Sequence, residues 1–178
     1  MTTQIDSVSA REVALYTTNT EALYTSRALP IIKNLARKRV NGTYDAAKAP
    51  KIWLYLARDG MKAYNREFKC DLRLNAATLT KCAEELAEHY EDLIAETVAD
   101  IRRDQDLRKT WTMATIRDFM QANGSHFFDR ETLKFFGETM KNFKSRVVDG
   151  VVYVDRTGGR AGSKSYRFNI ETRDLEQV

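Results

Sequence analysis

Apolar side chains recur every three or four residues along much of the first hundred residues of the chain. That spacing places them on one face of an α-helix. The pattern predicts one helix from residue 19 or 20 to residue 40, a second over residues 50–68, and a third from residue 75 or 78 to about residue 103. Pro30 lies inside the first run, and because proline lacks a backbone N–H we expect a kink or a break there. These runs predict an N-terminal helical bundle.

Two stretches of the chain lack a clear hydrophobic period. For residues 1–17 two alternatives stay open: Val8–Tyr16 forms a short strand, or it forms an arm docked on the bundle. Residues 104–111 are polar, and their composition is typical of a boundary. We therefore expect a helical domain over residues 1–106 and a smaller module over residues 107–178.

The second part of the chain has periodic elements of its own. A helix is predicted over residues 112–122, and a further helix is predicted to begin at Asp129 and to carry Phe143 on its buried stripe. The pair Asp149-Gly150, set between valines, is typical of a tight β-hairpin. Alternation over residues 151–156 and 165–170 predicts strands. The expected fold class is α+β: a helical bundle, then two helices and a three-stranded antiparallel meander, like a winged helix.

Composition sets the broad class of protein. The chain has 178 residues, 43% of them hydrophobic and 30% charged, which is enough apolar material for a core. Two cysteines are too few for a disulfide framework. Residues 1–20 lack the pattern of a signal peptide, and no apolar run has the roughly 20 residues needed to cross a bilayer. We expect a cytoplasmic protein without a membrane partner.

Charge is distributed unevenly along the chain. The net charge is only +4, but residues 31–69 hold ten Lys/Arg against three Asp/Glu, and residues 70–106 hold four against ten. The simplest interpretation is that the two segments neutralise each other within one bundle. Within the basic segment, Arg58, Lys62 and Arg66 are spaced four residues apart and form a stripe that suits contact with phosphates.

A second basic cluster lies around the predicted hairpin. Its glycines allow the backbone to approach a phosphate closely, and its cations would contact the groove or backbone of a nucleic acid. The candidate contacts in this cluster are Lys141, Lys144, Arg156, Arg160, Lys164 and Arg167. The leading hypothesis is therefore a non-enzymatic protein that binds DNA or RNA through a basic, glycine-rich wing, with help from the stripe on the second helix.

An acidic row supports an alternative from another class. It consists of Glu84, Glu88, Asp92, Glu96 and Asp100, each four residues from the next. Carboxylates at this spacing repel one another, so the row suits a basic partner. The alternative hypothesis is a protein-binding inhibitor that docks through this row or through an aromatic surface around Phe127.

Patterns that would carry catalysis or metal binding are incomplete. The stretch GGRAGSKS at residues 158–165 is only superficially like a phosphate-binding loop, because Ser163 separates Gly162 from Lys164 and a strand is expected to follow. His89 and His126 lie on different elements and lack partners at ligand spacing. No serine or cysteine is paired with a base in a recognisable set. We expect no enzymatic activity, no cofactor and no metal site.

Two segments resemble small proteins of bacteriophages and mobile elements. Residues 44–68, YDAAKAPKIWLYLARDGMKAYNREF, have the YD start, the central tryptophan and the closing Lys-x-Tyr-x-x-Glu-Phe of that pattern. Residues 126–140, HFFDRETLKFFGETM, are similar to an aromatic helix that precedes a small hairpin in other phage proteins. The resemblance implies a phage accessory protein that acts in the host cytoplasm. Under the alternative hypothesis, its partner is a host defence protein such as a CRISPR effector, and assembly of the phage particle is a third possibility.

Overall fold

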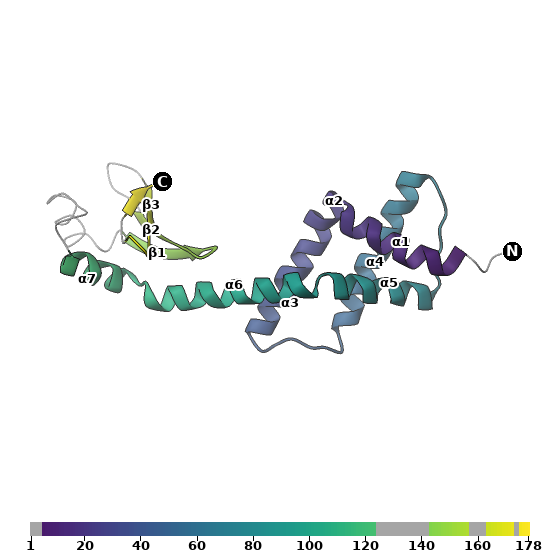
Figure 1. Cartoon of the computed structure of the whole chain (residues 1–178), viewed down its shortest axis with the longest axis horizontal. Coiled ribbons are helices and arrows are strands. Elements are labelled where there is room, and N and C mark those ends of the chain that lie inside the picture. The colour runs from purple at the N-terminus through teal and green to yellow at the C-terminus, as the bar shows by residue number, and fades with distance from the viewer. Residues whose placement is uncertain (1–4, 124–142, 157–162, 173–174) are drawn as a thin grey trace. The chain divides into compact units, whose positions relative to one another are not determined.

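The computed structural model describes residues 5–123, 143–156, 163–172 and 175–178. It is an α+β protein, as predicted, with helices first and an antiparallel sheet at the C-terminal end (Figure 1). The helices are α1 (Ile5–Asn19), α2 (Glu21–Leu23), the π-helical turn η1 (Tyr24–Ala28), α3 (Leu29–Val40), α4 (Ala49–Phe68), α5 (Ala76–His89), α6 (Glu91–Thr110) and α7 (Met113–Asn123). The strands are β1 (Phe143–Val148), β2 (Val151–Arg156), β3 (Lys164–Phe168) and β4 (Leu175–Gln177).

The chain forms two compact units, Met1–Ala99 and Asp100–Val178. The division falls inside α6, whereas the sequence predicted a boundary after residue 106. The expectation that residues 104–111 form a non-periodic linker is wrong, because all but the last of them belong to α6. Trp111, at the end of this stretch, packs against the core of the second unit.

Residues 5–19 form a helix, so the strand expected for Val8–Tyr16 is wrong; of the two alternatives, the segment docked on the bundle agrees with the structure, and it is helical. Helix α1 buries Ala10, Val13, Ala14 and Thr17, positions i, i+3, i+4 and i+7 of one helix face. Alanine and threonine contribute little to a hydrophobic pattern, which is why the period was not evident. Helix α1 packs against α4 and α5.

The break expected near Pro30 is present. Pro30 occupies the first turn of α3, where its missing N–H costs no hydrogen bond, and the π-helical turn η1 precedes it. Helix α3 then buries Ile32, Leu35 and Ala36 in the first unit. The predicted break thus takes the form of a change in helical winding before the proline.

Helix α4 has the bounds that the sequence predicted to within one residue, and it packs on α5. It buries Trp53, Leu56, Ala57 and Gly60. The third predicted helix is in fact two helices. Asn75 caps α5 by accepting a hydrogen bond from the Thr78 N–H, but this helix ends at Tyr90, and α6 begins directly after it.

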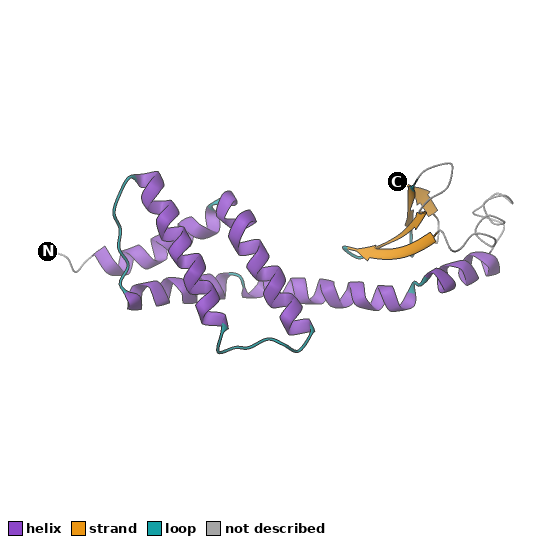
Figure 2. Ribbon diagram, turned by 180° about the vertical axis from the view of Figure 1, so that it is seen from behind, coloured by secondary structure: helices purple, strands orange, loops and turns teal. Residues whose placement is uncertain are grey.

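The second unit is built on a four-stranded meander in the order β1-β2-β3-β4, one strand more than predicted (Figure 2). The predicted hairpin at Asp149-Gly150 is confirmed: both residues have positive φ, 51° and 75°, as a tight two-residue turn requires. Phe143 begins β1 rather than ending a helix. Its buried ring joins Ile116, Val147, Val152, Val154 and Phe168 in the core of this unit.

Some expectations lie outside the described residues. They include the predicted helix beginning at Asp129 and the aromatic surface around Phe127. Among the described helices, none combines the length and apolar character needed to cross a membrane. Cys82 is buried and Cys70 is exposed, and both are free thiols.

Candidate nucleic-acid interface

The outer face of α4 is a continuous basic surface. Its side chains are all exposed and follow one another at three- and four-residue intervals: Lys51, Tyr55, Arg58, Lys62 and Arg66, with the exposed Lys69 directly after the last turn of the helix. At 3.6 residues per turn the five helical positions fall within roughly 80° of the helix circumference. We call this set the α4 basic face. It contains the predicted stripe of Arg58, Lys62 and Arg66 and extends it at both ends.

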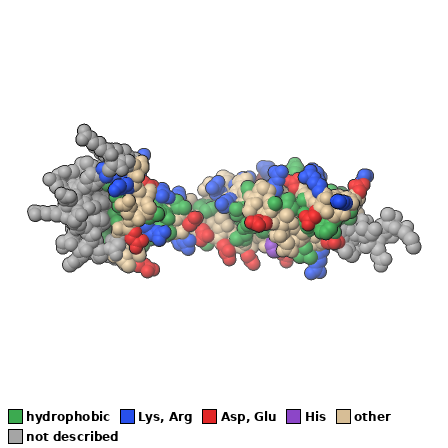
Figure 3. All heavy atoms as spheres, turned by 90° about the horizontal axis from the view of Figure 1, so that it is seen from above, with side chains coloured by type: hydrophobic (Ala, Val, Ile, Leu, Met, Phe, Trp, Pro, Cys, Tyr) green, Lys and Arg blue, Asp and Glu red, His purple; other side chains and the backbone are tan. Residues whose placement is uncertain are grey.

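Folding of the first unit fixes which way this face points. The buried residues of α4, with Trp53, Leu56 and Gly60 among them, lie on the opposite side of the helix and pack against α1 and α5. Because one side of α4 is held in the core, the charged side is held in solvent. Blue basic side chains gather along the upper edge of the helical unit in Figure 3.

The cations of the α4 basic face form no ion pair with any described residue. The two carboxylates on the same helix contact other helices. Asp59 lies 3.3 Å from Arg27, and Glu67 accepts a hydrogen bond of 2.6 Å from the Tyr16 hydroxyl, which raises the pKa of Tyr16. The positive charge of this face is therefore not compensated within the described part of the chain.

The expected neutralisation between residues 31–69 and residues 70–106 is limited to one ion pair among the described residues. This pair joins Arg39 to Glu91. The other ion pairs of the first unit lie within one segment or involve Arg27. The uneven charge seen in the sequence thus becomes an uneven surface.

An exposed aromatic ring interrupts the row of cations. Tyr55 is 64% exposed and lies between Lys51 and Arg58 along the helix. Large aromatic side chains normally bury most of their surface, so this ring is available for stacking. Lys51, Tyr55 and Lys69 were not among the predicted site residues, although their spacing to Arg58, Lys62 and Arg66 was the signal that would have found them.

The cations predicted around the hairpin do not form one surface. Lys141 and Arg160 lie outside the described residues. Side chains alternate between the two sides of a strand. Lys144 and Arg167 therefore lie on the outer side of the sheet, whereas Arg156 and Lys164 share the side of the buried Val154 and Phe168. The four described cations thus lie on two sides of the sheet, and their contact with nucleic acid stays a prediction.

The outer side of the sheet carries its own charged contacts. The guanidinium of Arg146 lies 4.2 Å from the centre of the Tyr153 ring and forms an ion pair with Asp155. Lys144 is directly opposite Asp155 in the register, and Arg167 is opposite both Tyr153 and Glu176. Acidic side chains next to these cations reduce their attraction for phosphate. The α4 basic face is the stronger candidate.

The acidic row is exposed along its whole length but is not one helix face. Glu84 and Glu88 lie on α5, and Asp92, Glu96 and Asp100 lie on α6, beyond the break at Tyr90. Asp100 belongs to the second unit and lies 3.1 Å from Arg103. The remaining members lie in the first unit.

Groups suited to metal binding are not assembled in the part of the chain that the structure describes. No three His, Cys, Asp or Glu side chains among the described residues are placed to hold a metal ion. His89 packs edge-on against Tyr90. Burial raises the pKa of the Cys82 thiol to about 12, the opposite of what activates a nucleophile. What the described surface offers is charge together with exposed aromatic rings, Tyr55 and Phe68.

Comparisons with protein-family models, with curated proteins and with solved structures found no match for this chain.

Proposed function

We propose that the protein is a non-enzymatic nucleic-acid-binding protein that contacts DNA or RNA through the α4 basic face. The observation that carries the proposal is the alignment of four exposed cations on the side of α4 opposite its buried side, followed by the exposed Lys69, all without ion-pair partners among the described residues. Backbone phosphates are the partners that such a row attracts. The resemblance of residues 44–68 to phage proteins supports a role as a phage accessory protein.

The length of the row favours an extended polyanion over a single phosphate. An α-helix rises 1.5 Å per residue, so the row from Lys51 to Arg66 is about 22 Å long. An isolated phosphate binds where several donors converge on one point. Cations spread along a line instead match the regular spacing of phosphates on a strand or along a duplex.

Tyr55 favours single-stranded nucleic acid over duplex. Proteins that bind single strands combine a basic track with aromatic rings on which exposed bases stack. In a duplex the bases already stack on one another and are not available to a ring on a helix surface. Tyr55, between Lys51 and Arg58, supplies the ring.

The experiment is fluorescence anisotropy of labelled single-stranded and duplex DNA and RNA at low and moderate salt. The test variant is Arg58→Ala/Lys62→Ala/Arg66→Ala, and the matched control is Arg11→Ala/Lys33→Ala/Arg37→Ala, which removes three exposed cations from α1 and α3. Each lost phosphate contact lowers the log–log salt slope by about 0.7 for a single strand, so we expect a slope lower by about 2 in the test variant. We also expect its affinity at low salt to fall roughly tenfold or more.

Equal affinity and slope in the test variant and the wild type would contradict the proposal. The hairpin cations have their own variant, Arg160→Ala/Lys164→Ala. If that variant alone loses binding, nucleic-acid contact belongs to the second unit and not to α4.

The acidic row supports the second candidate function, binding of a basic protein surface such as that of a host defence protein. Its observation is that Glu84, Glu88, Asp92 and Glu96 are exposed and form no ion pair with any described residue. The charge reversal Glu88→Lys/Asp92→Lys should abolish complex formation while circular dichroism stays unchanged. An intact complex after this reversal would remove the acidic row from consideration.

A further inference from the structure

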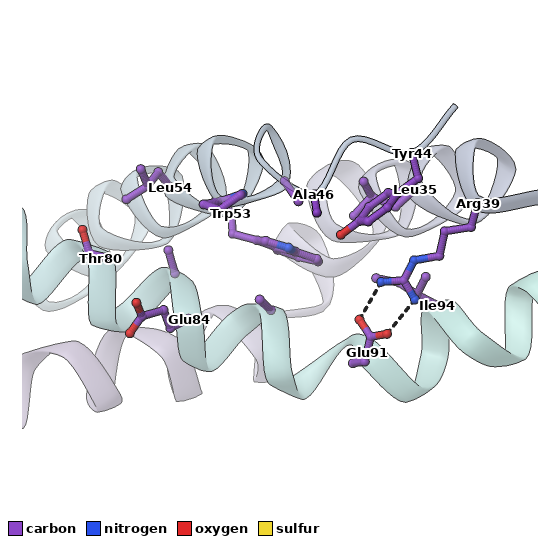
Figure 4. A pocket seen from close by; sticks show the side chains of 14 residues that line it. Leu35, Arg39, Tyr44, Ala46, Trp53, Leu54, Thr80, Glu84, Glu91 and Ile94 are labelled. Atoms are coloured by element: carbon purple, nitrogen blue, oxygen red, sulfur yellow. Dashed lines mark hydrogen bonds and ion pairs between the residues drawn. The ribbon is translucent and has the colours of Figure 1, made fainter. Parts of the chain in front are cut away.

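A pocket of about 280 Å³ lies inside the first unit, between α3, the connection that follows it, α4, α5 and the start of α6 (Figure 4). Its walls are mostly apolar, and three of its residues on α4 and α5 are the small side chains Ala49, Ala83 and Ala87. Small side chains leave open space where larger ones would fill the helix–helix contact. A concave, mostly apolar site with a few polar groups is the usual form of a small-molecule site.

Trp53 forms the centre of this pocket. Its side chain is only 4% exposed, and one face of the indole stacks on Tyr90 with ring centres 5.7 Å apart and planes 10° apart. Tyr90 holds the ring in place but does not line the pocket. The indole N–H of Trp53 has no hydrogen-bond partner among the described residues. The pocket therefore contains a fixed aromatic surface and a free donor.

The charged groups at the two ends of the pocket differ. Figure 4 shows the Arg39–Glu91 pair on one side of Trp53, and Glu84 and Thr80 on the other. Both terminal nitrogens of Arg39 are hydrogen-bonded to the two oxygens of Glu91, so these charges cancel. Glu84 has no ion-pair partner among the described residues. The lining therefore carries one uncompensated negative charge.

We propose that this pocket binds a small organic cation whose amine or guanidinium group is joined to an aromatic or aliphatic body. The cationic group pairs with the Glu84 carboxylate, and the body lies against Trp53 in the space left by Ala83 and Ala87. The face of an indole attracts cations, and its area stabilises an apolar body. An anionic ligand is disfavoured because the one cation of the pocket, Arg39, is already held by Glu91.

The site is separate from the proposed nucleic-acid interface. None of Arg58, Lys62 and Arg66 lines the pocket. The two activities therefore have separate tests, and a variant of one surface serves as a control for the other.

The experiment uses the full-length protein with Trp111→Phe, so that Trp53 is the single tryptophan. The NMR signal of the Trp53 indole N–H and the Trp53 fluorescence are followed during titration with two probes. The first, 2-phenylethylamine, is charged at pH 7. The second, 2-phenylethanol, has the same body without the charge. We expect saturable shifts with the amine and at least threefold weaker binding of the alcohol. An alcohol that binds as tightly as the amine, or the absence of saturable shifts with both probes, would overturn the proposal.

Three variants locate the binding site. Glu84→Gln should weaken amine binding by about two- to fivefold, the range of one exposed ion pair. Glu88→Gln, an exposed change on the same helix outside the pocket, should leave it unchanged. Ala87→Leu fills the pocket and should abolish the shift.

Equal effects of the two glutamine variants, or full binding by Ala87→Leu, would also overturn the proposal. The Arg58/Lys62/Arg66 triple variant should bind the amine like the wild type.

Discussion

Arg39 and Glu91 form a two-pronged ion pair between α3 and the first turn of α6. The Nη1–Oε1 distance is 2.6 Å and the Nη2–Oε2 distance is 2.9 Å. The Arg39 guanidinium also lies over the Tyr44 ring, 4.9 Å from its centre. The hydrogen bonds from Arg39 lower the pKa of Glu91, and those same bonds raise the pKa of Arg39. This pair is the one ionic link among the described residues between the basic and the acidic segments of the sequence.

Substitution Glu91→Gln should lower the free energy of unfolding at pH 7 by about 0.5–1.5 kcal/mol, because both groups are partly exposed. Glu91 has a lower pKa in the folded than in the unfolded chain. Its contribution is therefore complete above the ordinary glutamate pKa of about 4.3 and is lost as the pH falls through the lowered folded-state pKa. Urea unfolding at pH 7 and pH 3 should show a smaller wild-type advantage at pH 3 than at pH 7. An equal advantage at both values, or the same loss in Glu88→Gln, would contradict this assignment.

Gly60 and Thr17 are in contact where α4 packs on α1. A Cβ built at Gly60 would overlap the Thr17 hydroxyl, and Thr17 is fully buried with that hydroxyl donating to the Val13 carbonyl. Alanine is about 1 kcal/mol better than glycine inside a helix. Even so, we expect Gly60→Ala to destabilise the protein by about 1–3 kcal/mol because of the overlap. Thr17→Ala in the same chain removes the hydroxyl and should restore much of the loss. A double-mutant cycle by urea unfolding measures this coupling.

Helices with large apolar residues were predictable, and helices without them were not. Helix α4 was predicted within one residue because Trp53 and Leu56 mark its buried face. Helix α1 was missed because Ala10, Ala14 and Thr17 mark its buried face with small or polar side chains. The break at Tyr90 also left no local signal, because the stacking of Tyr90 on Trp53 is a contact between residues far apart in the sequence.

The candidate site was predictable only where it depends on a single helix. The spacing of Arg58, Lys62 and Arg66 places them on one side of α4 without any knowledge of the fold. The division of Lys144 and Arg156 between two sides of the sheet was not predictable, because the start of β1 at Phe143 was expected to be helical. A count of charges along the chain cannot distinguish one surface from two.

Asp104 supports the β1–β2 turn from α6 within the second unit. Its carboxylate accepts a hydrogen bond of 2.7 Å from the Gly150 N–H, and Arg108 donates a bond of 2.9 Å to the Val147 carbonyl. Asp104→Ala leaves a partly buried N–H without a protein acceptor, so we expect this unit to lose about 1–2 kcal/mol. Because the unit is less stable, hydrogen–deuterium exchange of the Val152 backbone N–H should become faster. Asp104→Asn keeps an acceptor oxygen and should lose less, and Asp106→Ala, at an exposed position, should have little effect. Equal exchange in Asp104→Ala and Asp106→Ala would show that the bond does not stabilise the turn.

Tyr55 distinguishes binding of single strands from simple attraction between charges. Tyr55→Ala leaves every cation of the α4 basic face in place, and the ring is too exposed to contribute to the core. Because one stacked base is worth about 1–3 kcal/mol, we expect this variant to bind single-stranded DNA or RNA about tenfold more weakly. Its duplex affinity and its salt slope should stay the same, since both depend on phosphate contacts.

Tyr55→Phe keeps the ring and should bind like the wild type. Anisotropy titrations of the wild type and the two variants test this prediction. If Tyr55→Phe loses as much affinity as Tyr55→Ala, the hydroxyl and not stacking makes the contact. If Tyr55→Ala loses equal affinity for single strands and for duplex, Tyr55 acts without touching a base.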